Sequence, residues 1–125
     1  MPRISNHLTL IANVVTDPTL RYTPDRKPVL DLRLAVNRRV QDGAGWKDGD
    51  PTYYDLVLWE DAAENAAVSY KAGTRVIVDG ELHTENWVGT DGIRRAKLVI
   101  TNAEIGPTTR YATVSVLKNE RVAAK

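Results

Sequence analysis

The sequence feature that most constrains the fold is an alternation of apolar and polar residues along several short stretches. It is clearest over residues 30–37, where Leu30, Leu32, Leu34 and Val36 are separated by single, mostly polar residues. Successive side chains of a β-strand point to opposite faces, so this period predicts a half-buried strand. We expect four more strands, at residues 8–14, 53–59, 75–78 and 95–100.

One segment, between the third and fourth of these strands, has a helical pattern instead. Asp61 is placed as an N-cap with Glu64 at the third position of the helix, and Gly73 is placed to end it. Small and aromatic residues supply the face toward the core: Ala62, Ala63, Ala66, Ala67 and Tyr70. The sequence therefore predicts one short helix of about three turns.

The connections are predicted from glycine, proline and aspartate. Asp17-Pro18 predicts a turn, residues 23–28 predict a loop, and residues 41–52, with three glycines and a proline, predict a long mobile loop. Gly80 follows the fourth strand and predicts a β-bulge, where a small barrel must bend. Residues 89–92, Gly-Thr-Asp-Gly, predict the turn of a hairpin.

Five strands with a single helix between the third and fourth follow the order of an OB-fold barrel, so we expect an all-β fold with one short helix. Another small antiparallel barrel or a β-sandwich is the alternative. Beyond Gly106-Pro107 the alternation returns over residues 112–116, which predicts an extra C-terminal strand outside the barrel. We thus expect a barrel domain at residues 1–105 and a C-terminal arm, at a subunit interface, at residues 106–125.

The composition excludes several classes of function. The chain lacks cysteine, which rules out disulfides, zinc–thiolate sites and thiol nucleophiles. His7 and His83, the only histidines, have no metal-ligand spacing. Asp48 and Asp50 come nearest to a catalytic pair of carboxylates, but they lie in a glycine-rich loop, where a solubilising role is expected. No apolar stretch is long enough to span a membrane, and the N-terminus lacks the apolar region of a secretory signal. We expect a cytoplasmic protein without catalytic residues, metal or cofactor.

Net charge alone is a weak indication of the partner. The chain carries a formal charge of +1, and residues 106–125 hold four basic residues and one acidic residue. Residues 1–105 are therefore weakly acidic overall. Any surface that binds a polyanion must arise from the local arrangement of side chains.

The strand at residues 53–59 is the most informative stretch for function. If Leu56 and Leu58 point into the barrel, then Tyr53 and Trp59 point out, and two large aromatic rings face solvent. In one interpretation a neighbouring subunit or the short helix covers these rings. In the other, the rings are free to stack against a planar ligand.

Further aromatic and basic side chains extend this surface. Trp87 lies at the start of a hairpin and points outward, and Trp46 lies in the glycine-rich loop, where we expect no core role. The basic residues interleaved with these aromatics are Arg33, Arg38, Arg39, Arg94, Arg95 and Lys97. Nucleobases stack on aromatic rings whatever their sequence, and basic side chains follow the phosphates. The alternative for each basic residue is an ordinary solvated charge.

Motifs in this sequence resemble those of the bacterial single-stranded DNA-binding proteins. Residues 12–22, Ala-Asn-Val-Val-Thr-Asp-Pro-Thr-Leu-Arg-Tyr, are similar to the Gly-Asn-Leu-x-x-Asp-Pro-Glu-x-Arg-Tyr opening of that family. The resemblance covers residues 5–105 and includes residues 32–36, 57–59, 63–65, 71–73, 78–82 and Trp87. Residues 104–107 and 110–113 resemble the branch found in high-GC Gram-positive bacteria, in which a C-terminal strand clasps a neighbouring subunit.

The resemblance implies sequence-independent binding and protection of single-stranded DNA by a nucleoid-associated homotetramer, in replication, recombination, repair or DNA uptake. Trp59 and Trp87 occupy the family's base-stacking positions, and Tyr53 stands where many members have a stacking tryptophan. Val40 replaces a further tryptophan of the family, so that contact is lost unless Trp46 supplies it. An OB-fold protein-interaction module without DNA binding is the alternative.

The end of the sequence differs from that of the family's housekeeping members. Those members finish with a flexible linker and an acidic tip that docks replication and repair enzymes, whereas residues 121–125 here are Arg-Val-Ala-Ala-Lys. We therefore expect no enzyme docking through an acidic tip. His83 and Glu85 stand where members often carry basic residues, which implies weaker attraction for DNA.

Overall fold

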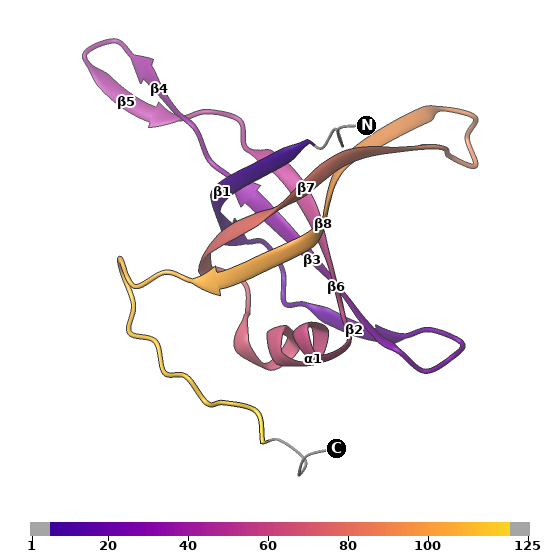
Figure 1. Cartoon of the computed structure of the whole chain (residues 1–125). Coiled ribbons are helices and arrows are strands. Elements are labelled where there is room, and N and C mark those ends of the chain that lie inside the picture. The colour runs from indigo at the N-terminus through magenta and orange to yellow at the C-terminus, as the bar shows by residue number, and fades with distance from the viewer. Residues whose placement is uncertain (1–5, 121–125) are drawn as a thin grey trace, which may run out of the picture.

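The computed structural model describes residues 6–120, which form a small β-barrel with two projecting hairpins (Figure 1). Its elements, in chain order, are β1 (His7–Val14), β2 (Thr19–Tyr22), β3 (Pro28–Val36), β4 (Arg39–Asp42), β5 (Gly45–Asp48), β6 (Thr52–Trp59), α1 (Glu60–Ser69), β7 (Arg75–Val88) and β8 (Arg94–Pro107). Residues 1–5 and 121–125 lie outside the described part. The expectation that the chain ends without an acidic tip concerns residues 121–125, so it also falls outside the described residues.

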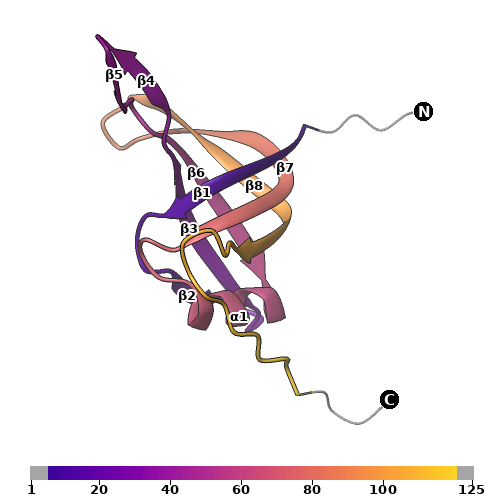
Figure 2. The same ribbon diagram turned by 90° about the vertical axis from the view of Figure 1, so that its left-hand side faces the viewer.

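Five strands close the barrel in the order β1–β7–β8–β6–β3, because β3 pairs back to β1. All pairs in this ring are antiparallel except the short parallel contact of β6 with β8. The helix α1 lies across one end of the barrel, as both Figure 1 and Figure 2 show. The predicted OB-fold barrel with one short helix is confirmed.

The alternating apolar residues become the inner face of the barrel, as predicted. Leu30, Leu32 and Leu34 of β3 are fully buried and pack with Leu56 of β6 and Ile100 of β8. Burying one such side chain contributes roughly 1.5–3 kcal/mol, so the shared inner face holds the ring together. It also fixes which side chains of the same strands face outward.

The helix begins and ends differently from the prediction. Trp59 rather than Asp61 is the N-cap residue, and no side chain caps the helix. The reason is that β6 runs directly into α1 through Glu60, whose φ of 54° makes the sharp turn. The helix ends at Ser69, and Gly73, at φ 92°, turns the chain afterwards and donates its N–H to the Val14 carbonyl. In residues 6–120, no helix is long and apolar enough to cross a membrane.

The prediction of a long mobile loop at residues 41–52 is wrong. Most of it forms the hairpin β4–β5, in which Gln41 pairs with Trp46, and this hairpin projects from the barrel (Figure 1). Gly43, at φ 63°, accepts the left-handed backbone that the tight turn needs. The short strand β2, whose alternation of Leu20 and Tyr22 with Thr19 and Arg21 spans only four residues, was also not expected and pairs with β3.

Gly80 forms the predicted bulge. The pairing of β7 with β8 shifts register between Asp79 and Glu81. A Cβ atom at Gly80 would lie 2.7 Å from Ile100 Cγ2 and 2.9 Å from the Ala103 Cβ, so this close approach requires glycine. Beyond the bulge β7 continues to Val88, further than predicted, and forms with β8 a second projecting hairpin (Figure 1).

The extra C-terminal strand is absent from the single chain. Within the described part of the segment after β8, residues 108–120 form no strand, and Val116 and Leu117 are almost fully exposed. An extended segment becomes a strand only by pairing, and the closed barrel leaves it no neighbouring edge within the chain. The apolar alternation over residues 112–116 is present, but no strand within residues 6–120 pairs with it.

Candidate functional site

A groove lies on the outer face of the barrel where β6 passes β8. Because Leu56 and Leu58 point inward, Tyr53 and Asp55 point outward, and pairing places Arg33 of β3 directly opposite Asp55. The groove has a volume of about 340 Å³. We call it the β6–β8 groove; its lining residues are Arg33, Pro51, Thr52, Tyr53, Asp55, Ala96, Lys97 and Leu98.

Two half-exposed aromatic rings lie at or next to this groove, and each makes a cation–π contact with a basic side chain of the groove. The guanidinium carbon of Arg33 lies 4.6 Å from the centroid of the Tyr53 ring. The ammonium nitrogen of Lys97 lies 5.8 Å from the centroid of the Trp87 ring, which follows the groove along the β7–β8 hairpin. Tyr53 and Trp87 are 43% and 44% exposed. Rings held in this way can accept a planar ligand, with positive charge beside it.

The charges in the groove are already paired across strands. Asp55 Oδ1 lies 3.8 Å from Arg33 Nη1, and Asp55 Oδ2 lies 3.5 Å from Lys97 Nζ. Lys97 Nζ also lies 3.9 Å from Glu85 Oε1, and His83 Nε2 lies 3.6 Å from Glu85 Oε2. Sequence reasoning missed Asp55 as a site residue. The sequence did indicate that Asp55 points outward, between Tyr53 and Val57. Only the strand pairing shows that Arg33 and Lys97 lie next to its carboxylate.

The structure places the other two predicted aromatics away from the groove. Trp59 shares the outer face of β6 with Tyr53 but lies six residues along the strand, roughly 20 Å away. It is 52% exposed, so α1 does not cover it as one interpretation expected. Trp46 is exposed on the β4–β5 hairpin, which projects from the barrel (Figure 1). Tyr53 thus lines the groove and Trp87 contacts its Lys97, whereas Trp59 lies farther along β6 and Trp46 lies on the β4–β5 hairpin.

The remaining predicted cations lie on the two hairpins. Arg38 directly precedes β4, and Arg39 at its start lies 3.8 Å from Asp48 across the hairpin. Arg95 pairs with Asp91 at 2.6 Å, near the turn of the β7–β8 hairpin. Arg94 follows the opposite face of that hairpin from Arg95, because neighbouring residues of a strand alternate. Of the six basic residues named from the sequence, the groove itself contains Arg33 and Lys97.

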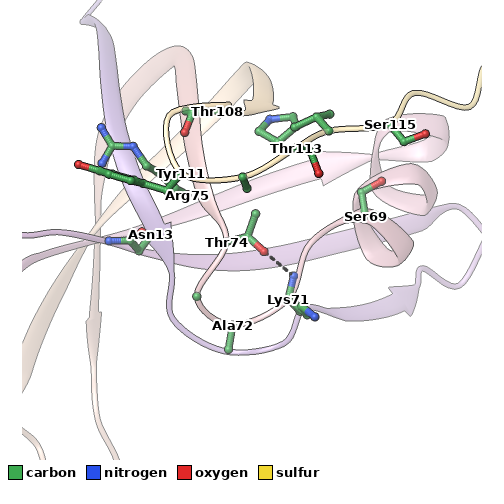
Figure 3. A pocket seen from close by; sticks show the side chains of 14 residues that line it. Asn13, Ser69, Lys71, Ala72, Thr74, Arg75, Thr108, Tyr111, Thr113 and Ser115 are labelled. Atoms are coloured by element: carbon green, nitrogen blue, oxygen red, sulfur yellow. Dashed lines mark hydrogen bonds between the residues drawn. The ribbon is translucent and has the colours of Figure 1, made fainter.

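A larger cavity, of about 640 Å³, lies at another part of the barrel, between the α1–β7 turn and the segment after β8 (Figure 3). Its one aromatic ring, Tyr111, has the Arg75 and Arg110 guanidinium carbons 5.5 and 5.6 Å from its centroid. Arg110 donates a hydrogen bond to the Tyr111 hydroxyl oxygen, which lowers the pKa of Tyr111. Arg75 Nε and Thr108 Oγ1 are the buried side-chain atoms of residues 6–120 that lack a hydrogen-bond partner.

This larger cavity is separate from the groove. Arg75 and Glu85 lie ten residues apart on β7, which corresponds to roughly 33 Å of extended strand. Its walls include exposed chain from the C-terminal segment. One aromatic ring lines each site, Tyr111 in the cavity and Tyr53 in the groove, but Lys97 of the groove also contacts a second ring, that of Trp87. The smaller groove therefore has the better arrangement for stacking a series of planar groups.

Comparison with known proteins adds a family to this geometry. Residues 5–108 match the Single-strand binding protein family. The chain is 37% identical over 116 residues to the single-stranded DNA-binding protein of Paenarthrobacter aurescens, covering 91% of this chain and 68% of that protein. It is also 37% identical over 116 residues to the single-stranded DNA-binding protein of Mycobacterium tuberculosis, covering 91% and 71%. Both organisms are high-GC Gram-positive bacteria, so the resemblance found in the sequence is confirmed.

A solved structure shows the same architecture. The small single-stranded DNA-binding protein from Streptomyces coelicolor superposes with a TM-score of 0.73 at 29% sequence identity. The match covers 84% of this chain and 95% of that one. The closed barrel described above is therefore the fold of these relatives.

Proposed function

Because this chain belongs to the single-strand binding protein family, we propose that it binds single-stranded DNA through the β6–β8 groove. The observation that carries this assignment is the pair of half-exposed rings, Tyr53 and Trp87, each with a cation within 6 Å of its centroid. Unpaired bases present their faces, and single strands present phosphates at the spacing of those bases. The groove meets both requirements at once.

Binding in this arrangement is independent of sequence. A base that stacks on Tyr53 or Trp87 is held through its π-face, which every base has, at roughly 1–3 kcal/mol per base. Arg33 and Lys97 are then free to turn from the rings toward phosphates. We propose that Trp59 and the exposed Trp46 continue the path of the strand beyond the groove, with Arg38, Arg39, Arg94 and Arg95 alongside.

We also propose that the protein acts as a homotetramer in the cytoplasm, where it protects single strands during replication, recombination, repair or DNA uptake without catalysing a reaction. Two features support assembly. Ile11 and Ile77 are paired neighbours on the outer face of β1 and β7, and both are nearly half exposed. The segment after β8, at residues 108–117, forms no strand and has exposed apolar residues, Val114, Val116 and Leu117, that a neighbouring chain can cover.

Tryptophan fluorescence tests the assignment. Oligo-dT stacked on Trp87 should quench emission in a saturable titration, whereas a duplex of the same length should quench little at moderate salt. Trp87→Phe should lose much of the quenching, and Val88→Ala, which changes the neighbouring side chain on the opposite side of the hairpin and removes no tryptophan, is the matched control. A protein-interaction module without DNA binding predicts no response to either DNA, and that result would refute the proposal.

A further inference from the structure

The β6–β8 groove contains a carboxylate at its centre. Asp55 lies between the outward side chains of β3 and β8, its side chain is 23% exposed, and its two oxygens face Arg33 on one side and Lys97 on the other. Glu85 holds Lys97 from a second direction. The two cations of the groove are therefore neutralised by the protein itself.

A phosphate that enters the groove must replace this carboxylate as the partner of each cation. Exposed ion pairs contribute only about 0–1 kcal/mol, so the pairs can be exchanged, but the gain from a new phosphate contact is reduced by the loss of the old one. Asp55 itself does not leave, since it is part of β6. Its negative charge continues to repel any phosphate close to it.

This reduction does not affect all nucleic acids equally. A single strand gains stacking on Tyr53 and Trp87, which Asp55 leaves available. A duplex has its bases stacked on each other, and it binds such a surface through its phosphates alone, at about one charge per 1.7 Å of axis. A groove whose cations are paired internally thus loses more of its attraction for a duplex than for a single strand.

We propose that Asp55 is a specificity-determining residue that makes the groove select single strands over duplex DNA. This inference rests on the proposed function, since it concerns the same groove. Arg33 and Lys97 supply positive charge at short range to a strand already stacked on the rings. Asp55 keeps that charge from attracting double helices that cannot stack.

The experiment measures the affinities of a fluorescently labelled single strand and a duplex of equal length, by anisotropy at low and moderate salt. The proteins are the unaltered chain, Asp55→Asn, and Asp31→Asn as the matched control. Asp31 lies on the same outer face of β3–β6 and pairs with Arg21 at 2.7 Å, outside the groove lining. Asp55→Ser is a second variant in case Asp55→Asn fails to fold, which circular dichroism would reveal.

We expect Asp55→Asn to raise duplex affinity on the order of tenfold and single-strand affinity about threefold, with the duplex salt slope steeper by about 0.9 for each phosphate newly contacted. If duplex binding by the unaltered chain is too weak to measure, detectable duplex binding by Asp55→Asn at the same concentrations counts as the expected increase. Three outcomes overturn the proposal: an unchanged preference for single strands, weaker binding of both DNAs, or an equal change in Asp31→Asn. If the unaltered chain binds no single strand, the proposed function has failed instead.

Discussion

Two outer faces of the same barrel differ in what they expose. The β6–β8 groove offers aromatic rings covered by cations, Tyr53 with Arg33 and Trp87 with Lys97. The face of β1 and β7 offers two aliphatic side chains instead, since Ile11 pairs directly with Ile77. Both sets point outward for the same reason, the alternation of strands around a filled core. The comparison shows that exposed apolar surface on one barrel can serve different kinds of partner.

The face of β1 and β7 also has its own charged cluster. Asp79 accepts a hydrogen bond from the Thr9 hydroxyl, and His7 Nε2 lies 3.0 Å from Asp79 Oδ1. The hydrogen bond from Thr9, followed by the contact with His7, lowers the pKa of Asp79 below its usual value of 3.8. Aliphatic side chains bordered by such polar contacts are typical of a surface that meets protein, whereas rings beside cations suit nucleic acid.

The largest expected effect is on assembly. Ile77→Glu places a charge where we propose that a second copy packs, and burying an unpaired charge costs several kcal/mol. We expect a smaller assembly by light scattering, with the groove still able to bind a short single strand. Val68→Glu, at an exposed valine of α1, is the matched control. If the assembly of Ile77→Glu has the same mass as that of the unaltered chain, the face of β1 and β7 is not the one that meets another subunit.

The second effect is on DNA affinity. Trp87→Ala removes one stacking surface and should weaken single-strand binding by roughly 1–3 kcal/mol, with normal circular dichroism. Val88→Ala changes the next residue, which points to the opposite side of the hairpin, and should leave affinity within error. Titration with a short oligonucleotide measures both. Equal losses in the two variants would mean that the hairpin, and not the ring, is what matters.

A third, smaller effect concerns the segment after β8. A chain ending at Pro107 keeps every strand of the barrel and loses the exposed apolar residues that follow. We expect it to fold, to keep its single-strand affinity, and to dissociate into smaller species at higher concentration than the full chain. Sedimentation over a dilution series measures this. Identical dissociation of the two proteins would show that the segment takes no part in assembly.

The smallest effect is on stability against pH. Because its pKa is lowered on folding, Asp79 contributes stability that is present above pH 3.8 and is lost as the pH falls through the lower folded value. Asp79→Asn should therefore lower Tm slightly at pH 7, and the difference should shrink as the pH falls below 3.8. Glu104→Gln, at the residue that pairs with Asp79 in β8, is the control. A difference in Tm that stays constant as the pH falls below 3.8 would show that the contribution does not depend on the carboxylate charge.

The sequence was informative wherever a local period was enough. Alternation located the barrel strands and the outward Tyr53, and Gly80 indicated the bulge. It failed where neighbours in space decide the outcome. The β4–β5 hairpin has few apolar residues to show a period, and Asp55 acquires its role only because β3 and β8 bring Arg33 and Lys97 to it. The helix start was misplaced because the strand before it leaves no room for a separate cap residue.

The bulge at Gly80 has a mechanical consequence for the hairpin that holds Trp87. From Glu81 to Val88, β7 runs eight residues past the bend, a length of roughly 23 Å. A change of about 10° at the bend would move the far end by roughly 4 Å, close to the spacing between neighbouring strands. The direction of the hairpin is thus set by the bend at Gly80, which packs tightly against Ile100 and Ala103. The position of the Trp87 ring therefore depends on a buried glycine in the barrel wall, seven residues before it in the sequence.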